Sequence, residues 1–179
     1  KAMAIAFLLI LIYVGFRFTP QFAPGGVIAL IHDVLVTCAV WQILGQQFDL
    51  QVLAALLAII GYSINDTIVI FDRVRENLLH RRKESMAKIL NDSLNQTLTR
   101  TIISNGTTFL AVLGLFLFGG EVLRGFGFTM VVGILVGTYS TLFIAVPLVN
   151  WWHGRKGGTE IAAAAVKTPV KAAKTKATV

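Results

Sequence analysis

The sequence predicts an all-α membrane protein, a polytopic bundle of transmembrane helices with a cytoplasmic interfacial helix and a disordered basic tail. Two observations predict this fold class. Among the 179 residues, 55% are hydrophobic and only 14% are charged, whereas an ordinary soluble domain carries about 25% charged residues. The apolar residues also form blocks of roughly 20 residues without the alternation of barrel strands, which favours spanning helices over a β-barrel.

Five transmembrane helices are expected. The first covers residues 2–16, and we interpret it as a spanning helix because no small-residue cleavage site of a signal peptide follows it. The chain begins with lysine instead of methionine, so we expect a further segment upstream. Glycine-containing turns separate the remaining blocks. These blocks predict spans over residues 27–44, 52–71, 102–118 and 126–149.

Two segments are predicted to lie outside the membrane. An amphipathic interfacial helix is expected over residues 74–98, where it either only links two spans or also docks a partner. Its apolar residues recur at helical spacing, at Met86, Leu90, Leu94 and Leu98. The segment 153–179 is rich in Ala, Thr and Lys and has little large apolar surface, so we expect a disordered cytoplasmic tail.

The basic residues predict the orientation of the bundle. Lysine and arginine accumulate on the cytoplasmic side of membrane proteins. Arg17, the stretch 73–100 and the tail after residue 155 carry nearly all of them, so we place the N-terminus outside and the C-terminus in the cytoplasm. This topology accounts for the net charge of +7. Because no aromatic residues are interleaved with the basic ones, nucleic-acid binding is not expected.

Cysteine labelling from each side of the membrane tests this orientation. Cysteines introduced at Arg82 and Lys174 are expected to react only from the cytoplasm, and those at Gln47 and Glu121 only from outside. The single natural cysteine, Cys38, lies inside a predicted span. Labelling at position 47 from the cytoplasm would show that the orientation is wrong.

Two aspartates, Asp33 and Asp66, fall inside the predicted spans, where an ionisable side chain is costly and marks a candidate functional site. On a helix, Ser63, Asp66 and Thr67 lie within about 100° of one another and form a polar stripe that should face protein or water. Asp66 is six residues before Asp72, which places it roughly 9 Å inside the cytoplasmic boundary. For both aspartates, the simpler alternative is a hydrogen bond that only joins neighbouring helices.

Arg100 is the expected counter-charge of Asp66, because it precedes the fourth span and lies toward the same end. Its guanidinium cannot lose its proton. A carboxylate that gains and loses a proton beside it has two states, ionised and paired or neutral and released, which can couple proton transport to helix movement. The supporting polar residues are predicted to be Asp33, Ser63, Asn65 and Thr67.

Gly133 and Gly137 lie four residues apart in the last span and are predicted to serve helix packing, because small residues allow close approach of two helices. No metal or cofactor is expected. Two other functions stay open. One is an intramembrane hydrolase, built from Ser63 with His32 or from two aspartates, although Ser63 lacks the following glycine of a nucleophile turn. The other is a purely structural subunit in which the polar stripe only specifies packing.

A longer run carries a resemblance to a known family. Residues 61–77, GYSINDTIVIFDRVREN, resemble the signature of the SecF family of bacterial protein-export membrane subunits, within the resistance-nodulation-division superfamily. The similarity extends to residues 29–34 (ALIHDV), 95–101 (NQTLTRT) and 132–140 (VGILVGTYS). It covers about residues 1–150.

The resemblance implies six spans and a periplasmic domain after the first, of which this chain would hold the last five spans. It implies a multi-pass protein of the bacterial inner membrane that is not an enzyme. With SecD, such a subunit uses the proton-motive force to assist the SecYEG translocon late in secretion. YajC, secreted preproteins and membrane lipid are the other partners implied. The positions that match the family's proton-transport residues are Asp66 and Arg100.

Overall fold

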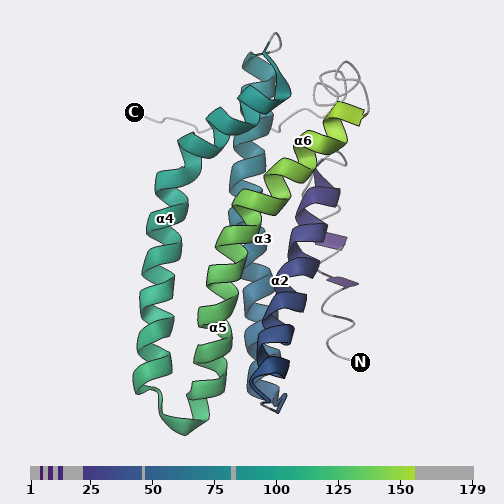
Figure 1. Ribbon diagram of the computed structural model, residues 1–179. Coiled ribbons are helices and arrows are strands. Elements are labelled where there is room, and N and C mark those ends of the chain that lie inside the picture. The colour runs from purple at the N-terminus through teal and green to yellow at the C-terminus, as the bar shows by residue number, and fades with distance from the viewer. Residues whose placement is uncertain are drawn as a thin grey trace, which may run out of the picture.

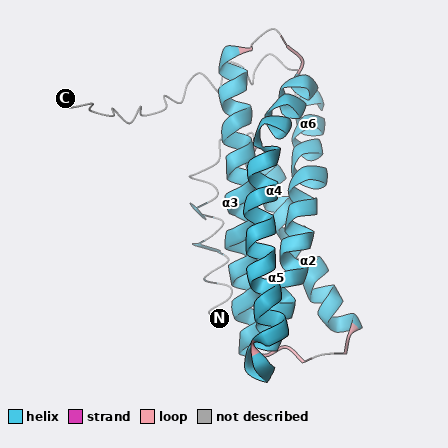
Figure 2. Cartoon of the chain, turned by 90° about the vertical axis from the view of Figure 1, so that its left-hand side faces the viewer, coloured by secondary structure: helices cyan, strands magenta, loops and turns pink. Residues whose placement is uncertain are grey.

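A computed structural model describes residues 5, 8, 9, 12, 13, 22–45, 47–81 and 84–155 of the chain. Within these residues the protein is helical and has no strand. The helices run side by side along one axis, and the turns between them lie at the two ends (Figures 1 and 2). In chain order they are α2 (Ala23–Ile43), α3 (Leu50–His80), α4 (Met86–Phe118), α5 (Gly120–Ser140), the π-helical turn η1 (Thr141–Ala145) and α6 (Val146–Arg155).

The predicted class, an all-helical membrane protein, is confirmed. Among the described residues, four stretches are long and apolar enough to cross a membrane: Ala23–Ile43, Leu50–His80, Met86–Phe118 and Gly120–His153. They contain the predicted second to fifth spans almost completely. Most of the first predicted span, residues 2–16, lies outside the described residues, as do Arg17, Arg82 and the tail from residue 156 with Lys174. The tail was expected from residue 153, but residues 153–155 still belong to α6.

The separate interfacial helix predicted over residues 74–98 is not observed. Instead, α3 continues to His80 and α4 begins at Met86, so both helices extend beyond their apolar blocks. Val74 and Leu90 in these extensions are 0% and 2% exposed, because they pack into the core of the bundle. Extending an existing helix costs far less than nucleating a new one, and this burial stabilises the extensions. The amphipathic pattern therefore reports packing within the bundle.

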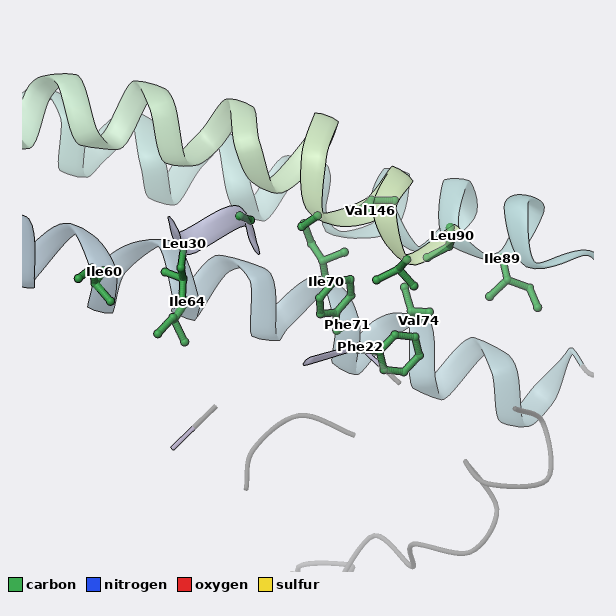
Figure 3. Close-up of a cluster of buried hydrophobic side chains, with 13 residues drawn as sticks. Phe22, Leu30, Ile60, Ile64, Ile70, Phe71, Val74, Ile89, Leu90 and Val146 are labelled. Carbon is green, nitrogen blue, oxygen red and sulfur yellow. The ribbon is translucent and has the colours of Figure 1, made fainter. Parts of the chain in front are cut away.

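The largest hydrophobic core joins α2, α3, α4 and α6 near the α3–α4 turn (Figure 3). Phe22 belongs to this core and is only 1% exposed. Its ring stacks on Phe71 and on His153, with ring centroids 5.4 and 5.7 Å apart. This core fixes the relative positions of α2 and α3, the helices that carry the two intramembrane aspartates.

The last span consists of α5, the π-helical turn η1 and α6, which follow one another without a loop. Pro147 follows this π turn by two residues. Proline has no backbone N–H and its ring clashes with the carbonyl four residues earlier, so a regular α-helical ladder cannot pass through this point. Beyond η1, α6 leans toward the end of α2 (Figure 1). Thr141, the first residue of η1, is 1% exposed inside the bundle.

The loop between α2 and α3 and the turn between α4 and α5 lie at the same end of the bundle (Figure 1). Asp49 in the first connection lies 3.9 Å from the position that a Cβ on Gly125 would occupy. Asp49 also caps α3, because its Oδ1 accepts a hydrogen bond of 2.7 Å from the Val52 N–H. The two connections that hold Gln47 and Glu121 are therefore on one side, as an even number of crossings between them requires.

At Gly133, α5 approaches α3 closely. A Cβ at this position would collide with the side chain of Ile59, which is 1% exposed. Gly137, one turn later, faces Ser63 and Asp33, but a Cβ there would lie 3.5 Å from Ser63 Oγ, an ordinary contact. The two glycines thus differ in how much close packing depends on them.

Gly133→Ala is therefore expected to destabilise the protein relative to Gly137→Ala by about 1–3 kcal/mol, the usual cost of overpacking a core. Both changes gain the same helix propensity, so the comparison isolates the contact with Ile59. Thermal unfolding of the two variants in the same detergent measures this difference. Equal stability would mean that α5 can move away from α3 without cost.

Candidate functional site

Asp66 lies inside the bundle and is bound by two side chains of α4. Its side chain is 9% exposed. Thr101 Oγ1 donates a hydrogen bond of 3.1 Å to Oδ1, and Asn105 Nδ2 donates one of 3.1 Å to Oδ2. Both donors are neutral. The carboxylate is therefore satisfied by hydrogen bonds, without a cation in direct contact among the described residues.

Asn105 extends this site to α5 and forms a second contact with α3. Its Nδ2 also donates to Thr138 Oγ1 on α5, at 2.8 Å. Its Oδ1 accepts a hydrogen bond of 2.7 Å from the hydroxyl of Tyr62 on α3. Both the oxygen and the nitrogen of the Asn105 amide group thus form hydrogen bonds within the bundle. We call these residues, Tyr62, Asp66, Thr101, Asn105 and Thr138, the Asp66 network.

Helical spacing explains how the sequence builds this network. Thr101 and Asn105 are four residues apart on α4, and Tyr62 and Asp66 are four apart on α3, so each pair lies on one face of its helix. The two helices are antiparallel neighbours, which lets the pairs meet. The sequence shows this spacing, and it is the signal that would have identified Thr101 and Asn105 as the partners of Asp66.

Arg100, the predicted partner of Asp66, lies elsewhere in this structure. Its side chain is exposed, and no ion pair joins it to Asp66 among the described residues. It borders a cavity of about 360 Å³ between α3 and α4. This cavity is lined by Val69, Asp72, Arg73, Glu76, Gln96, Thr97 and Arg100. Adjacent helix residues are about 100° apart, so when Thr101 faces Asp66, Arg100 points to a different side.

Asp33 forms a second buried carboxylate site, between α2 and α3. It is 1% exposed. Ser63 Oγ donates a hydrogen bond of 2.6 Å to Asp33 Oδ2, and His32 Nδ1 lies 3.3 Å from Asp33 Oδ1. Gly137 of α5 faces both Ser63 Oγ and Asp33 Oδ2. The side chains of Asp33 and Ser63, thirty residues apart in sequence, are in direct contact.

Thr67 connects this second site to η1. Its Oγ1 donates a hydrogen bond of 3.0 Å to the Ser63 carbonyl and lies 3.3 Å from Thr141 Oγ1. Thr141 in turn donates to the Gly137 carbonyl, at 2.8 Å. The start of the π turn is therefore tied by hydroxyl groups to the helix that carries both sites.

The structure thus divides the predicted site residues into three groups. Ser63 and Thr67 accompany Asp33 on one side of α3, while Asp66 faces α4. Asn65 is exposed on the outer surface of α3 and has no hydrogen bond to either aspartate. The position of Asn65 within an apolar run does not show which side of the helix this residue occupies.

The geometry also bears on hydrolytic chemistry. The pairing of Ser63 with His32 that a serine nucleophile was considered to use is not observed, because the hydroxyl of Ser63 donates to Asp33. Asp33 and Asp66 each have separate hydrogen-bond partners on different helices, which is unlike a carboxylate pair that shares one proton. Within the residues that the structure describes, no three His, Cys, Asp or Glu side chains are grouped to hold a metal ion.

Comparison with known proteins gives matches that cover most of the chain. Residues 1–155 match the family described as "Protein export membrane protein SecD/SecF, C-terminal". A "Protein translocase subunit SecF" of Koribacter versatilis (strain Ellin345) is 49% identical over 150 residues, which cover 82% of this chain and 37% of that protein. The protein of the same name from Desulfurispirillum indicum is 48% identical over 157 residues, covering 86% of this chain and 50% of that one.

A third relative of this name, from Calditerrivibrio nitroreducens, is 51% identical over 142 residues, or 78% of this chain and 47% of its own length. The chain therefore spans half the length or less of these three relatives.

Proposed function

The chain belongs to the family of protein export membrane proteins SecD/SecF, to the C-terminal region of that family, and we propose that it serves a proton-driven step of protein export. The proposal has two parts. The relatives are named as translocase subunits, which supports a role in moving proteins across a membrane. The buried Asp66 network supports protons as the source of energy for that movement.

The observation that carries the proposal is the set of neutral donors around Asp66. An ionised carboxylate inside a membrane protein is costly, and here only Thr101 and Asn105 offset that cost directly. The ionised and protonated forms of Asp66 therefore differ in their demands on α4. Such a group can bind a proton in one arrangement of the helices and release it in another.

Protonation of Asp66 changes the network in a defined way. A proton on Oδ1 requires the hydroxyl of Thr101 to turn from donor to acceptor. A proton on Oδ2 places two donors opposite one another, because Asn105 Nδ2 also donates there. If Asn105 turns its amide, the hydroxyl groups of Tyr62 and Thr138 must exchange their roles as donor and acceptor. Protonation is thereby coupled to contacts among α3, α4 and α5.

Arg100 supplies the second arrangement in this proposal. Rotation of α4, or a swing of the long arginine side chain from its cavity, brings the guanidinium toward Asp66 in place of Thr101. Asp66 is ionised and paired with Arg100 in that state, and it carries a proton in the state in which its partners are the neutral side chains of Thr101 and Asn105. One charge crossing a potential of about 100 mV provides about 2.3 kcal/mol, which is enough to shift the balance of two such states.

Membership of this family supports a set of partners and a location for this step. The full-length protein acts with SecD, and with YajC as a further subunit, on preproteins that pass through SecYEG. It lies in the bacterial inner membrane, in contact with lipid, with Gln47 outside and the α3–α4 turn in the cytoplasm. This orientation places the Arg100 cavity on the cytoplasmic side, where released protons would enter the cell.

Depletion and restoration of the full-length protein tests the proposed function. Export of a secreted preprotein is expected to slow on depletion and to recover when the protein is restored. The recovered part is expected to disappear when a protonophore removes the proton-motive force, because the force acts through this subunit. Recovery that is insensitive to the protonophore would contradict the proton-driven role and leave a purely structural one.

A further inference from the structure

We propose that His32 and Asp33 form a second proton-binding site, separate from Asp66. This inference deepens the proton-driven function proposed above and rests on it. The site takes up one proton, on the imidazole of His32 or on a carboxyl oxygen of Asp33, and protonation of Asp33 Oδ2 changes the hydrogen bond between α2 and α3. The ligand of the site is the proton, which passes between the imidazole and the carboxyl group.

Burial of Asp33 is the first step of the argument. The carboxyl group is 1% exposed, and its direct partners are the neutral hydroxyl of Ser63 and the imidazole of His32. An ionised carboxylate this deep in the protein needs a partner of opposite charge. His32 provides that charge only when it is protonated. The proton therefore resides either on the imidazole or on the carboxyl group, and its complete removal leaves an unpaired buried charge.

The elements packed against α2 bring few other ionisable groups to this place. On α3, the residue in contact is Ser63, while Asp66 three residues later faces α4. On α5, the residue in contact is Gly137, and Glu121 and Arg124 lie near the far end of that helix.

Two further elements among the described residues, η1 and α6, pack against α2. The residue of η1 nearest to the site by hydrogen bonding is Thr141, through Thr67. His153 of α6 stacks on Phe22, at the end of α2. Among the described residues, His32 is thus the ionisable side chain in contact with Asp33.

His32 is the member of the pair that groups outside the described bundle can reach. Its side chain is 32% exposed, whereas that of Asp33 is 1% exposed. Histidine changes its charge near neutral pH, which suits it to pass a proton to a neighbouring group. A chain of His and Asp side chains within a membrane is typical of proton relays.

The hydrogen bond between Ser63 of α3 and Asp33 depends on the protonation state of Asp33. When Asp33 is ionised, Ser63 Oγ donates to it at 2.6 Å. When Asp33 carries a proton on Oδ2, the carboxyl group becomes the donor and the hydroxyl of Ser63 must turn to another acceptor. Ser63 and Asp66 are three residues apart on α3, and the two carboxylates share no hydrogen-bond partner. Two separate proton-dependent contacts therefore act on one helix.

The experiment uses the full-length protein reconstituted with SecD and infrared difference spectroscopy of protonated carboxyl groups across a pH titration. The variants are Asp33→Asn, His32→Gln and Asp66→Asn. Asp49→Asn is the matched control, since Asp49 is exposed and asparagine caps a helix as well as aspartate does. His32→Gln changes a partly exposed residue, so it keeps the test informative if Asp33→Asn fails to fold.

We expect a titrating carboxyl band that is lost in Asp33→Asn and kept in Asp66→Asn and Asp49→Asn. In His32→Gln the pH dependence of this band is expected to change, because ionised Asp33 has lost its counter-charge. Asp33→Asn is expected to slow proton-driven export several-fold without abolishing it. Identical spectra of the wild type and Asp33→Asn, or an unchanged titration in His32→Gln, would overturn the second site.

The same variants separate this inference from the proposed function. If Asp66→Asn stops proton-driven export and no band belongs to Asp33, only the second site is wrong. If Asp66→Asn leaves proton-driven export unchanged, the proposed function is wrong, and a band from Asp33 would then be assigned to a structural proton.

Discussion

Asp66→Asn is expected to lower preprotein export to the level measured with a protonophore present, while the protein still inserts and assembles with its partner. Asparagine has nearly the same shape as aspartate and keeps an oxygen that can accept from Thr101 or Asn105. It cannot bind and release a proton. Export assays in cells that express the full-length variant in place of the wild type, at matched protein levels, measure this effect.

Asn65→Ala is the matched control for this prediction. Asn65 adjoins Asp66 in sequence but is exposed on the outer face of α3. Its replacement is expected to leave proton-driven export close to that of the wild type. If the Asp66 network had a purely structural role, Asp66→Asn would instead preserve both packing and export.

Arg100→Met is expected to cause a loss of proton-driven export as large as that of Asp66→Asn. Without the guanidinium, the paired state of Asp66 loses its counter-charge, so Asp66 holds its proton and the cycle stops in the arrangement with neutral donors. In Asp66→Asn, Arg100 loses the same pairing. The double variant is therefore expected to lose little more than either single variant, because two residues that act jointly are not additive.

A double-mutant cycle on export that depends on the proton-motive force measures this coupling. Lys88→Met serves as the control for the removal of a positive charge, since Lys88 is exposed and its ion pair within the described residues is with Glu84 one turn away. Losses that multiply between Asp66→Asn and Arg100→Met would show that the two residues act independently, even if each of them is necessary.

Much of the fold follows from hydropathy alone. The apolar blocks located four helices because a span must satisfy its backbone within itself, which leaves little choice of structure. The lengths of α3 and α4 were not predicted, because an amphipathic pattern shows that one face is covered and not what covers it. Leu90 packs into the bundle core, although lipid headgroups would have satisfied the same pattern.

The candidate site was predicted in part for a similar reason. Asp33 and Asp66 stand out because carboxylates are rare in apolar blocks, and Ser63 follows from its place on the polar stripe. The partners of Asp66 depend on the rotation of α4 about its axis. That rotation is fixed by side-chain packing. If α4 were turned by the angle between two adjacent residues, about 100°, Arg100 would face Asp66 in place of Thr101. Charge favoured Arg100 in the sequence, whereas hydrogen bonds from Thr101 and Asn105 are observed.

The most direct test of the central claim, that Asp66 binds and releases the transported proton, is proton uptake by liposomes that contain the full-length protein with SecD. A pH-sensitive dye inside the vesicles records the flux when a membrane potential is imposed. The account predicts uptake with the wild type and with Asn65→Ala, and a flux no greater than that of empty liposomes with Asp66→Asn. Uptake by Asp66→Asn at the rate of the wild type would contradict it.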